Sequence, residues 1–586
     1  MNNETRPSMR SPKAPGAADL VLHDGRILTL DASDTVAEAI AVQGERIVAV
    51  GRSADLLPLA GPSATVIDLR GRTAMPGLID GHAHADREGL KSLLPNLSSV
   101  KSIADIQDRV AEEVARATPG AWLVFNPVGD PPEFSGIPGA LREGRMPNRL
   151  DLDKVAPDNP VYIRAPWGYW PNVLPLYSSA NSAALRAAGI DKVTPSPSRL
   201  VTIEKDAVSG EPTGVFVEQT LEPIVEFTLM ACAPNFTIEQ RAQALRHSMR
   251  AYNAAGTTSV FEGHGISSDV MAAYQMVRNA GDMTLRAHLV FSPSWGSATK
   301  DDVRLMLASW VQWLARRGLG DHWLRVADIY TEINEAPETR LRRRMPVQTG
   351  WAGYSPDSGL PREAVFELML EAARNGIRVS GIWANLLELF REVDRIVPIA
   401  GRRWVLGHQR TLDREQVALV RDLGVALTTH TNRHIYKQGS AIRASIGRDK
   451  ESTIVPIRTL LDQNVPVAFS TDGVPTSLFN PVWQAVERVD RDTGDVIAPD
   501  QRISRVEALR CATSGGAFLT FEEAEKGTLE PGKLADIVVT TEDPIAIEAS
   551  RLRDIVAAVT IVGGKVAYVR DKSPVDASTP ASMLSS

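Results

Sequence analysis

The chain has 586 residues, 43% of them hydrophobic, which is enough apolar material for a large core and a smaller companion domain. Its formal net charge of −7 is mild for this length and disfavours a nucleic-acid-binding surface. The basic run Arg342–Arg344 is therefore interpreted as a solvated surface or a local ion-pair partner, and not as a polyanion site. Cys232 and Cys511 lie far apart without CxxC spacing, so we expect two buried thiols, and neither a disulfide framework nor a thiolate zinc cluster.

The first segment, 1–18, is rich in Pro, Ser, Asn and charge, and it contains no apolar run that could serve as the core of a signal peptide. No later segment offers ~20 consecutive apolar residues for a membrane span. We therefore expect a soluble cytoplasmic protein with disordered tails at 1–18 and 576–586. The sequence leaves the oligomeric state open, a homo-oligomer included.

Short β-branched runs separated by Asp-Gly and Gly-Glu turns occupy the region 19–51, and they indicate antiparallel strands and hairpins. The same pattern of short β-branched runs and glycine turns recurs at 534–539 and 559–568. We therefore predict a small β-domain built from 19–75 and 525–575, with a larger domain at 76–524 inserted between its two halves.

The central region alternates short apolar runs with longer amphipathic stretches, which is the pattern of repeated β-α units. Helices are predicted at 237–256 and 361–376, because each segment carries apolar residues at helical spacing and ends at a glycine. The number of candidate strands suits an α/β fold of the (β/α)8 TIM-like barrel type. These strands are 77–84, 121–125, 258–261, 285–290, 324–330, 378–382, 404–406, 425–428 and 467–470.

An aromatic-rich insert is predicted at about 131–218. This stretch is crowded with Pro, Gly, Tyr and Trp, and it includes the run Trp167–Pro171. Its aromatic density favours either a lid near a substrate pocket or the half-buried packing of an insert. Both interpretations stay open at this point.

The segment Pro76–His84 reads PGLIDGHAH, an apolar lead into two histidines separated by one residue. On a β-strand that spacing points both imidazoles to the same face, so one metal ion can contact both. In a parallel barrel the pair would sit near the C-terminal end of the strand, where barrel active sites are built. His82 and His84 are therefore the first candidate metal ligands, and core or surface histidines are the alternative.

This motif, the late Ser470–Asp472 and the closing segment Gly527–Asp536 together resemble the amidohydrolase superfamily. The segments Asn181–Ile190 and Gly210–Phe216 are similar to its amidohydrolase 3 branch, which includes N-substituted formamide deformylases. The resemblance covers nearly the whole chain. It implies a metal-bearing (β/α)8 barrel flanked by a β-sandwich built from both termini.

Hydrolysis of an amide needs an electrophile at the carbonyl and a nucleophile stronger than bulk water, and one metal supplies both by lowering the pKa of its bound water to roughly 7. The resemblance implies that Asp472 is both a metal ligand and the general base that passes a proton to the leaving nitrogen. It also implies that His408 ligates a metal or holds substrate. A capping aspartate and a structural histidine are the alternatives.

Two positions depart from the family's pattern. The bridging lysine expected within Arg325–Tyr330 is absent, and no histidine occurs within Val379–Asn385 on the fifth strand. Asp328 or Glu332 could supply a carboxylate in place of the lysine, or be structural. Because losing both groups would dismantle a second metal site, we predict a mononuclear centre holding zinc, with manganese or iron as alternatives.

Other histidines follow predicted strands. His264 comes just past one strand, and His430 and His434 follow the seventh strand, with Arg433 and Lys437 nearby for an anionic group. Strand-end placement favours a substrate-binding role for His264 or His430. Hydrogen-bonded loop histidines are the alternative.

The leading hypothesis is a metal-dependent hydrolase of a C–N bond in an amide, formamide or cyclic amide of a small molecule. A decarboxylase or C–O hydrolase of the same fold is the first alternative, because barrels keep their architecture while loop residues change the chemistry. A degenerate barrel that binds a ligand without catalysis is the second. The intact His82, His84 and Asp472 argue against it.

Overall fold

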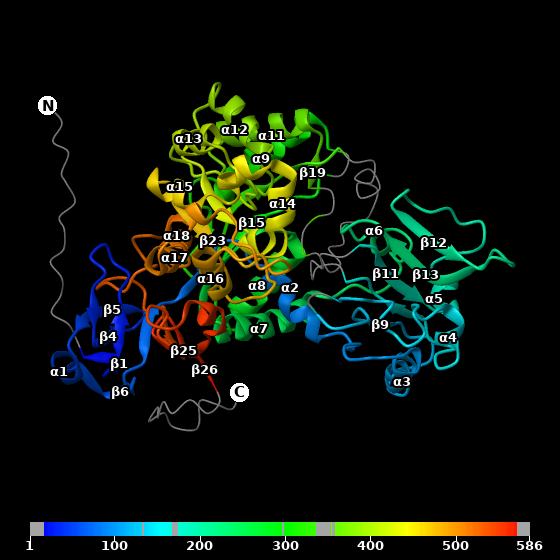
Figure 1. Ribbon diagram of the computed structural model, residues 1–586, viewed down its shortest axis with the longest axis horizontal. Coiled ribbons are helices and arrows are strands. Elements are labelled where there is room, and N and C mark those ends of the chain that lie inside the picture. The colour runs from blue at the N-terminus through cyan, green and yellow to red at the C-terminus, as the bar shows by residue number, and fades with distance from the viewer. Residues whose placement is uncertain are drawn as a thin grey trace.

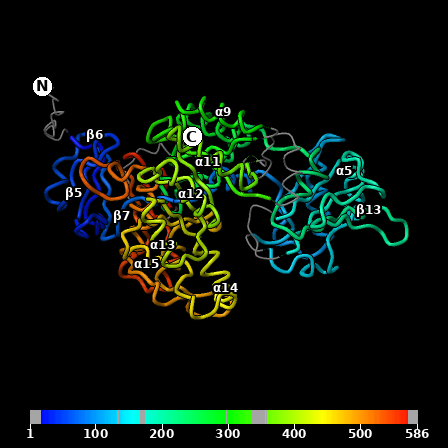
Figure 2. The backbone as a smooth tube through the Cα atoms, turned by 90° about the horizontal axis from the view of Figure 1, so that it is seen from above, coloured from blue at the N-terminus to red at the C-terminus, as the bar shows by residue number. Residues whose placement is uncertain are grey.

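The computed structural model describes residues 17–131, 134–166, 174–295, 298–335, 353, 355 and 358–570. In Figure 1 a central barrel carries a β-domain on one side and a separate insert on the other. The view from above in Figure 2 shows the same succession. The predicted basic run Arg342–Arg344 and the aromatic run Trp167–Pro171 fall outside the described residues.

Eight parallel strands in chain order form the wall of the barrel. Across the closing seam, Gly81 N donates to Phe469 O at 2.8 Å. The predicted (β/α)8 barrel is confirmed, but the predicted strand 121–125 does not belong to it. The barrel strands are β8 (Leu78–Asp80), β14 (Thr257–Ile266), β15 (Arg286–Phe291), β17 (Leu324–Tyr330), β20 (Val379–Gly381), β21 (Val405–Leu406), β22 (Ala426–Thr429) and β23 (Val467–Phe469).

Helices surround the strands, and both helices predicted from periodicity are present, as α7 (Ile238–Ala254) and α11 (Arg362–Arg374). A capping box between Thr237 and Gln240 starts α7, and Gly256 follows its end with a φ of 88°, a left-handed conformation that glycine adopts without strain. Further covering helices are α8 (Ser268–Asn279), α9 (Lys300–Leu314), α12 (Leu386–Asp394), α13 (Arg414–Leu423), α15 (Ile457–Asp462), α17 (Arg505–Cys511) and α18 (Ser514–Leu519).

The β-domain consists of two sheets that share a buried cluster including Leu22, Val42, Ile537 and Ile561. One sheet has the order β5 (Arg46–Gly51), β4 (Ala39–Gln43), β1 (Ala18–His23) and β6 (Ala60–Asp68). The other has the order β26 (Lys565–Val569), β25 (Ala557–Val562), β24 (Ile537–Thr540), β7 (Thr73–Pro76), β2 (Arg26–Leu28) and β3 (Val36–Ala37). Strands from the two ends of the chain thus pair directly, β24 with β7.

The insert between β8 and β14 has a sheet of its own. Its order is β12 (Val201–Lys205), β13 (Pro212–Glu218), β11 (Leu176–Ala180), β10 (Val161–Ile163) and β9 (Leu123–Phe125), with α3 (Ile103–Val114), α4 (Arg149–Asp153) and α5 (Ser182–Ala187). The run 121–125 therefore pairs here rather than in the barrel, because three apolar residues specify a strand but not its partner. Asn181 explains part of the family motif: its side chain caps α5 and bonds the backbone at Val161.

The two cysteines have different environments. Cys511 is buried as predicted, whereas the prediction of a buried thiol is wrong for Cys232, which lies exposed in a turn of the insert. Within the described part of the chain, no helix combines the length and apolar character needed to cross a bilayer.

A buried ion pair joins the barrel to the β-domain. Arg286 on β15 donates from Nε and Nη2 to the two carboxylate oxygens of Asp536, at 2.8 and 2.9 Å. Gly563 N also donates to this carboxylate at 2.9 Å. Arg286 is 1% exposed and Asp536 is 5% exposed. The closing motif that ends at Asp536 therefore has a structural role at this junction.

Replacing Asp536 by alanine should leave the Arg286 guanidinium buried without its main carboxylate. We expect the free energy of unfolding, measured by urea denaturation, to fall by about 3–5 kcal/mol. As a control, Arg421→Ala removes one member of the exposed Arg421–Asp422 pair and should cost about 0–1 kcal/mol. Equal losses in the two variants would contradict a supporting role for the buried pair.

Candidate metal centre

The predicted site residues gather at the C-terminal ends of the barrel strands. His82 and His84 lie just beyond β8 rather than within it. Between them, Ala83 donates its N–H to Phe261 O of β14 at 2.9 Å, which continues the ladder past the strand. Both histidines are buried, and their ring centroids are 5.3 Å apart. The alternation expected of a strand is therefore kept in the segment that follows it.

Asp472 lies among four imidazoles. Its Oδ1 is 3.6 Å from His82 Nε2, 3.0 Å from His84 Nε2 and 3.5 Å from His408 Nε2. Its Oδ2 is 3.5 Å from His430 Nδ1. The structure thus brings together the residues predicted as metal ligands, and it places His430 against the other carboxylate oxygen.

Burial and proximity set the charges in this cluster. Burial lowers the pKa of His82, His264 and His430 well below the ordinary value, so these imidazoles are neutral. Burial alone would raise the pKa of Asp472, yet His430 and His408 beside it hold that pKa well below its usual range. Neutral imidazoles and an ionised carboxylate are the forms in which these groups bind a metal.

The donor set fits a divalent cation. Ligand atoms of His82, His408 and Asp472 lie within 4.8 Å of one another, and so do those of His82, His84 and His264. Within the described residues, His82 Nε2 and His408 Nε2 are buried without a hydrogen-bond partner, an arrangement that costs free energy unless a ligand satisfies them. Imidazole nitrogen with carboxylate oxygen suits zinc and related first-row cations.

Asp80 ties the first barrel strand to the last. Its Oδ1 accepts hydrogen bonds from the backbone of His82 and Thr471, each at 3.1 Å, and its Oδ2 accepts one from the Thr471 hydroxyl. The next residue, Asp472, has a φ of 56°, and His408 has a φ of 53°. Residues other than glycine hold such left-handed conformations only where their surroundings enforce them, often at functional sites. The Asp80 contacts therefore fix the carboxylate opposite the histidines.

The three histidines that the sequence left open have different positions. The ring centroid of His264, at the end of β14, is 5.8 Å from that of His84. His430, just past β22, has its centroid 4.7 Å from that of His408. The ring centroid of His434 is 5.7 Å from that of His430. Burial lowers the pKa of His434 to about 3. His264 and His430 thus reach the cluster, whereas His434 supports it from behind.

The carboxylates considered as substitutes for the family lysine are engaged elsewhere. Asp328 accepts two hydrogen bonds of 2.5 Å from Arg378, and its Oδ2 is 3.4 Å from His288 Nε2. Glu332 accepts a hydrogen bond of 3.2 Å from Trp383 Nε1. Of the groups able to hold a metal in the described part of the chain, none includes Asp328 or Glu332. The contacts of Asp328 favour its structural role.

A further group, His84, Asp86 and Glu262, also has ligand atoms within 4.8 Å of one another. Arg87 already supplies a cation there, because its Nη2 is 2.6 Å from His84 Nδ1 and its Nε is 3.6 Å from Asp86 Oδ1. Arg87 Nη2 is also 3.3 Å from His84 Nε2, the nitrogen that lies 3.0 Å from Asp472 Oδ1. Such outer contacts orient histidine ligands in metal sites.

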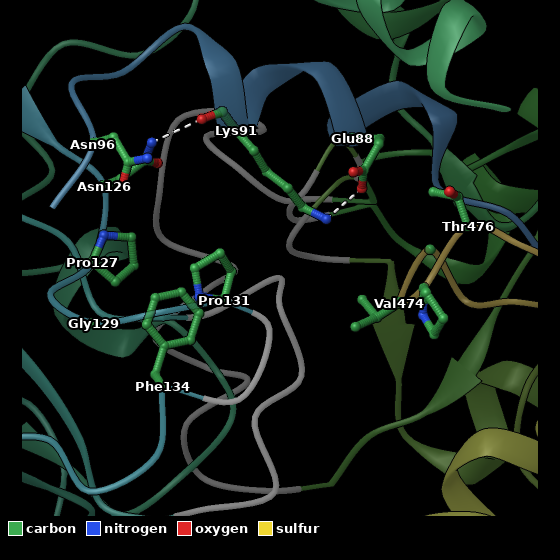
Figure 3. Close-up of a pocket in the computed structure, with 12 residues that line it drawn as sticks. Glu88, Lys91, Asn96, Asn126, Pro127, Gly129, Pro131, Phe134, Val474 and Thr476 are labelled. Atoms are coloured by element: carbon green, nitrogen blue, oxygen red, sulfur yellow. Dashed lines mark hydrogen bonds and ion pairs between the residues drawn. The ribbon is translucent and has the colours of Figure 1, made fainter. Parts of the chain in front are cut away.

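A cavity of about 340 Å³ borders the site, next to Asp472. A Cβ on Gly473 would lie 3.2 Å from His84 Cβ, which shows how closely the cavity wall approaches the metal ligands. Figure 3 shows Lys91 paired with Glu88 of the same helical segment, along one wall of the cavity. The lining comes from the helix after His84, the insert and the loop after Asp472: Glu88, Lys91, Asn96, Asn126, Pro127, Gly129, Pro131, Phe134, Gly473, Val474, Pro475 and Thr476.

The profile of the amidohydrolase family matches residues 65–568. The chain belongs to the amidohydrolase family. The prediction from sequence motifs is thereby confirmed, including the expectation that the protein is an amidohydrolase, a hydrolase acting on carbon–nitrogen bonds other than peptide bonds.

Individual relatives cover almost the whole chain. The N-substituted formamide deformylase of Arthrobacter pascens is 26% identical over 95% of this chain and 99% of its own length. Protein LONG AFTER FAR-RED 3 of Arabidopsis thaliana is also 26% identical, over 95% of this chain and 93% of its own length. The solved structure of an uncharacterized metal-dependent hydrolase from Pyrococcus horikoshii OT3 has a TM-score of 0.65 at 19% identity, covering 91% of this chain and 99% of that chain. The last comparison supports the fold.

Sequence reasoning gave no role to several residues that shape this amidohydrolase site. Asp80 lies inside the recognised motif. A carboxylate within an apolar run is unusual, and this feature could have identified Asp80 as a candidate from the sequence. Arg87 and Arg378 carried no such signal, because their partners come from contacts within the fold. Trp383, 40% exposed, has its ring centroid 6.4 Å from that of His408.

Metal removal should destabilise this amidohydrolase. Because the donor set exists only in the folded chain, a bound ion stabilises the folded state by mass action. We expect chelation to lower the melting temperature, and zinc to restore it. The His82→Ala/His84→Ala double variant should respond to neither treatment. Metal analysis should find about one equivalent in the wild type. A wild-type melting temperature that ignores chelator and zinc would contradict the fit of the donor set.

The Asp80→Asn variant should bind metal more weakly, because an amide cannot accept as strongly from both His82 and Thr471 as a carboxylate does. We expect zinc affinity to fall about 10- to 100-fold, as for other outer contacts of metal ligands. Competition with a chromophoric chelator measures the zinc affinity. Asp422→Asn, on the exposed end of α13, is the control and should leave affinity unchanged. Unaltered affinity in Asp80→Asn would contradict the positioning role.

Proposed function

We propose that this amidohydrolase cleaves a C–N bond in a small amide, formamide or cyclic amide, with one zinc ion as its cofactor. The position of Asp472 carries the proposal. Its Oδ1 faces the Nε2 atoms of three histidines, whereas its Oδ2 faces His430. The two oxygens are therefore available for different tasks, one toward the ion and one toward a proton.

In this proposal His82, His84, His408 and Asp472 Oδ1 hold the ion. A divalent cation in such a donor set supplies Lewis acidity toward the carbonyl and makes water a competent nucleophile at neutral pH. The missing lysine and fifth-strand histidine support one ion rather than two. The contacts of Asp328 with Arg378 and His288 support the same conclusion, because they commit that carboxylate elsewhere.

Asp472 Oδ2 acts as the general base. It takes a proton from the attacking water and returns it to the leaving nitrogen, which must depart as a neutral amine. His430 Nδ1, 3.5 Å away, orients this oxygen. His264, beside the His82 and His84 rings, is placed to hold the substrate at the other side of the ion. The deformylase of Arthrobacter pascens supports a formamide as one substrate class to test.

A panel of amides, formamides, hydantoins and esters, assayed with zinc-loaded protein, tests this function. We expect amine release from at least one C–N class. The Asp472→Asn variant should lose about 10²- to 10⁴-fold in kcat, because its side chain keeps the shape but not the basicity of the carboxylate. Metal analysis of the same samples separates loss of the base from loss of the ion, and Asp422→Asn is the surface control.

Other outcomes would select other functions. Turnover of esters alone, or release of carbon dioxide, would favour the same-fold C–O hydrolase or decarboxylase. No turnover by fully zinc-loaded protein across the panel would favour ligand binding without catalysis. Full activity in Asp472→Asn would rule out this residue as the base.

A further inference from the structure

A short π-helix, Asn432–Lys437, follows the seventh barrel strand and carries Arg433, whose charge interacts with that of Asp472. It begins two residues after His430, whose Nδ1 is 3.5 Å from Asp472. π-Helical turns are rare in proteins, and those that do occur are often found at functional sites. Arg433 stands between His430 and His434 in the sequence, and the ring centroids of these two histidines are 5.7 Å apart.

Buried polar contacts hold the π-helix in place. Asn432 Nδ2 donates to Val474 O at 2.7 Å, which ties it to the loop that follows Asp472 and lines the cavity. Gln484 donates to Asn432 Oδ1 at 3.1 Å and accepts from the Thr431 hydroxyl at 2.8 Å. Residues fixed in this way position a functional group more accurately than a free loop does.

Arg433 is half-buried and forms no hydrogen bond or ion pair with any residue that the structure describes. Burial lowers the pKa of this guanidinium, the charge of Asp472 opposes that shift, and Arg410 reinforces it. Arginine nonetheless stays protonated at neutral pH. A desolvated cation without a carboxylate partner is costly, and a divalent ion nearby would increase the repulsion. An anionic ligand would offset both costs.

The neighbours of Arg433 narrow the kind of anion. The residues that flank Arg433 along this segment, His430 and His434, carry imidazoles and add no second guanidinium or ammonium group. Arg410 is exposed and donates to Ser445 Oγ at 3.2 Å. A single guanidinium without a partner among the described residues matches one monoanion, and its planar fork fits the two oxygens of a carboxylate.

We propose that Arg433 binds a carboxylate of the substrate, so that the substrates are N-acyl amino acids or similar amides with a carboxylate near the scissile bond. This inference rests on the proposed amide hydrolysis and names its substrate class. Arg433 is then a specificity-determining residue. It contacts a part of the substrate that does not react, which distinguishes it from Asp472 and the histidines.

Matched substrates that differ only in charge test the inference. N-formyl and N-acetyl leucine should be hydrolysed with a higher kcat/KM than the corresponding leucinamides. In Arg433→Gln, we expect kcat/KM for the carboxylates to fall about 10- to 100-fold, mainly through KM, because a charged hydrogen bond to the substrate is lost. The leucinamides should change less than about threefold, since they make no ion pair.

Two further variants define the effect. Arg433→Lys keeps the charge without the fork and should retain part of the preference for carboxylates. Arg421→Gln removes the same charge from the surface of α13 and should leave the preference unchanged. A preference for leucinamides, or an Arg433→Gln variant with the wild-type preference, would overturn the inference while leaving amide hydrolysis intact.

A binding measurement makes the inference independent of turnover. In metal-free protein at pH 8, calorimetry should detect 4-methylpentanoate binding that Arg433→Gln weakens about 10-fold or more, and no comparable binding of 4-methylpentanamide. This result would support the carboxylate site even if no amide in the panel were hydrolysed. Equal binding of the acid and the amide would overturn it.

Discussion

The seam between the first and last barrel strands is the constraint on which the rest of this site depends. Asp80 and Thr471 are 391 residues apart, and their hydrogen bonds join the backbone just before the histidine pair to the backbone just before Asp472. The seam therefore sets the distance between the imidazoles and the carboxylate. Among the residues described, neither the insert nor the β-domain contributes a ligand to this group, but the insert lines part of the adjacent cavity.

Charge balance explains why the cluster is arranged around one carboxylate. Burial lowers the pKa of His82 and His430 well below the ordinary value, whereas His430 and His408 hold the pKa of Asp472 well below its usual range, so Asp472 supplies the negative charge of this cluster. Arg87 holds His84 from behind and faces Asp86. On the opposite barrel strands Arg378 neutralises Asp328. Each arginine thus pairs with a carboxylate that would otherwise be available to a metal, which agrees with the proposal of a single ion at Asp472.

Much of this arrangement was predictable from local patterns. The apolar run before His82 and His84, and the one before Asp472, placed these residues at strand ends, and parallel strands of a barrel bring such ends together. The same reasoning failed for 121–125, because a short apolar run does not specify which sheet it joins. It also failed for Cys232, since the exposure of a turn depends on what packs over it. The partners of Asp328 were beyond prediction, because Arg378 and His288 come from neighbouring strands.

The sequence by itself determined the barrel, the amidohydrolase family and the candidate metal-binding side chains, because strand periodicity and short motifs are local properties of a chain. The absence of the family lysine was also visible there. Only the tertiary structure decided which oxygen of Asp472 faces which histidine, that Asp328 is held by Arg378, and that Arg433 has no hydrogen-bond or ion-pair partner among the residues described. These are relations between residues distant in the chain, and they depend on how the strands close and on which side chains burial leaves unpaired.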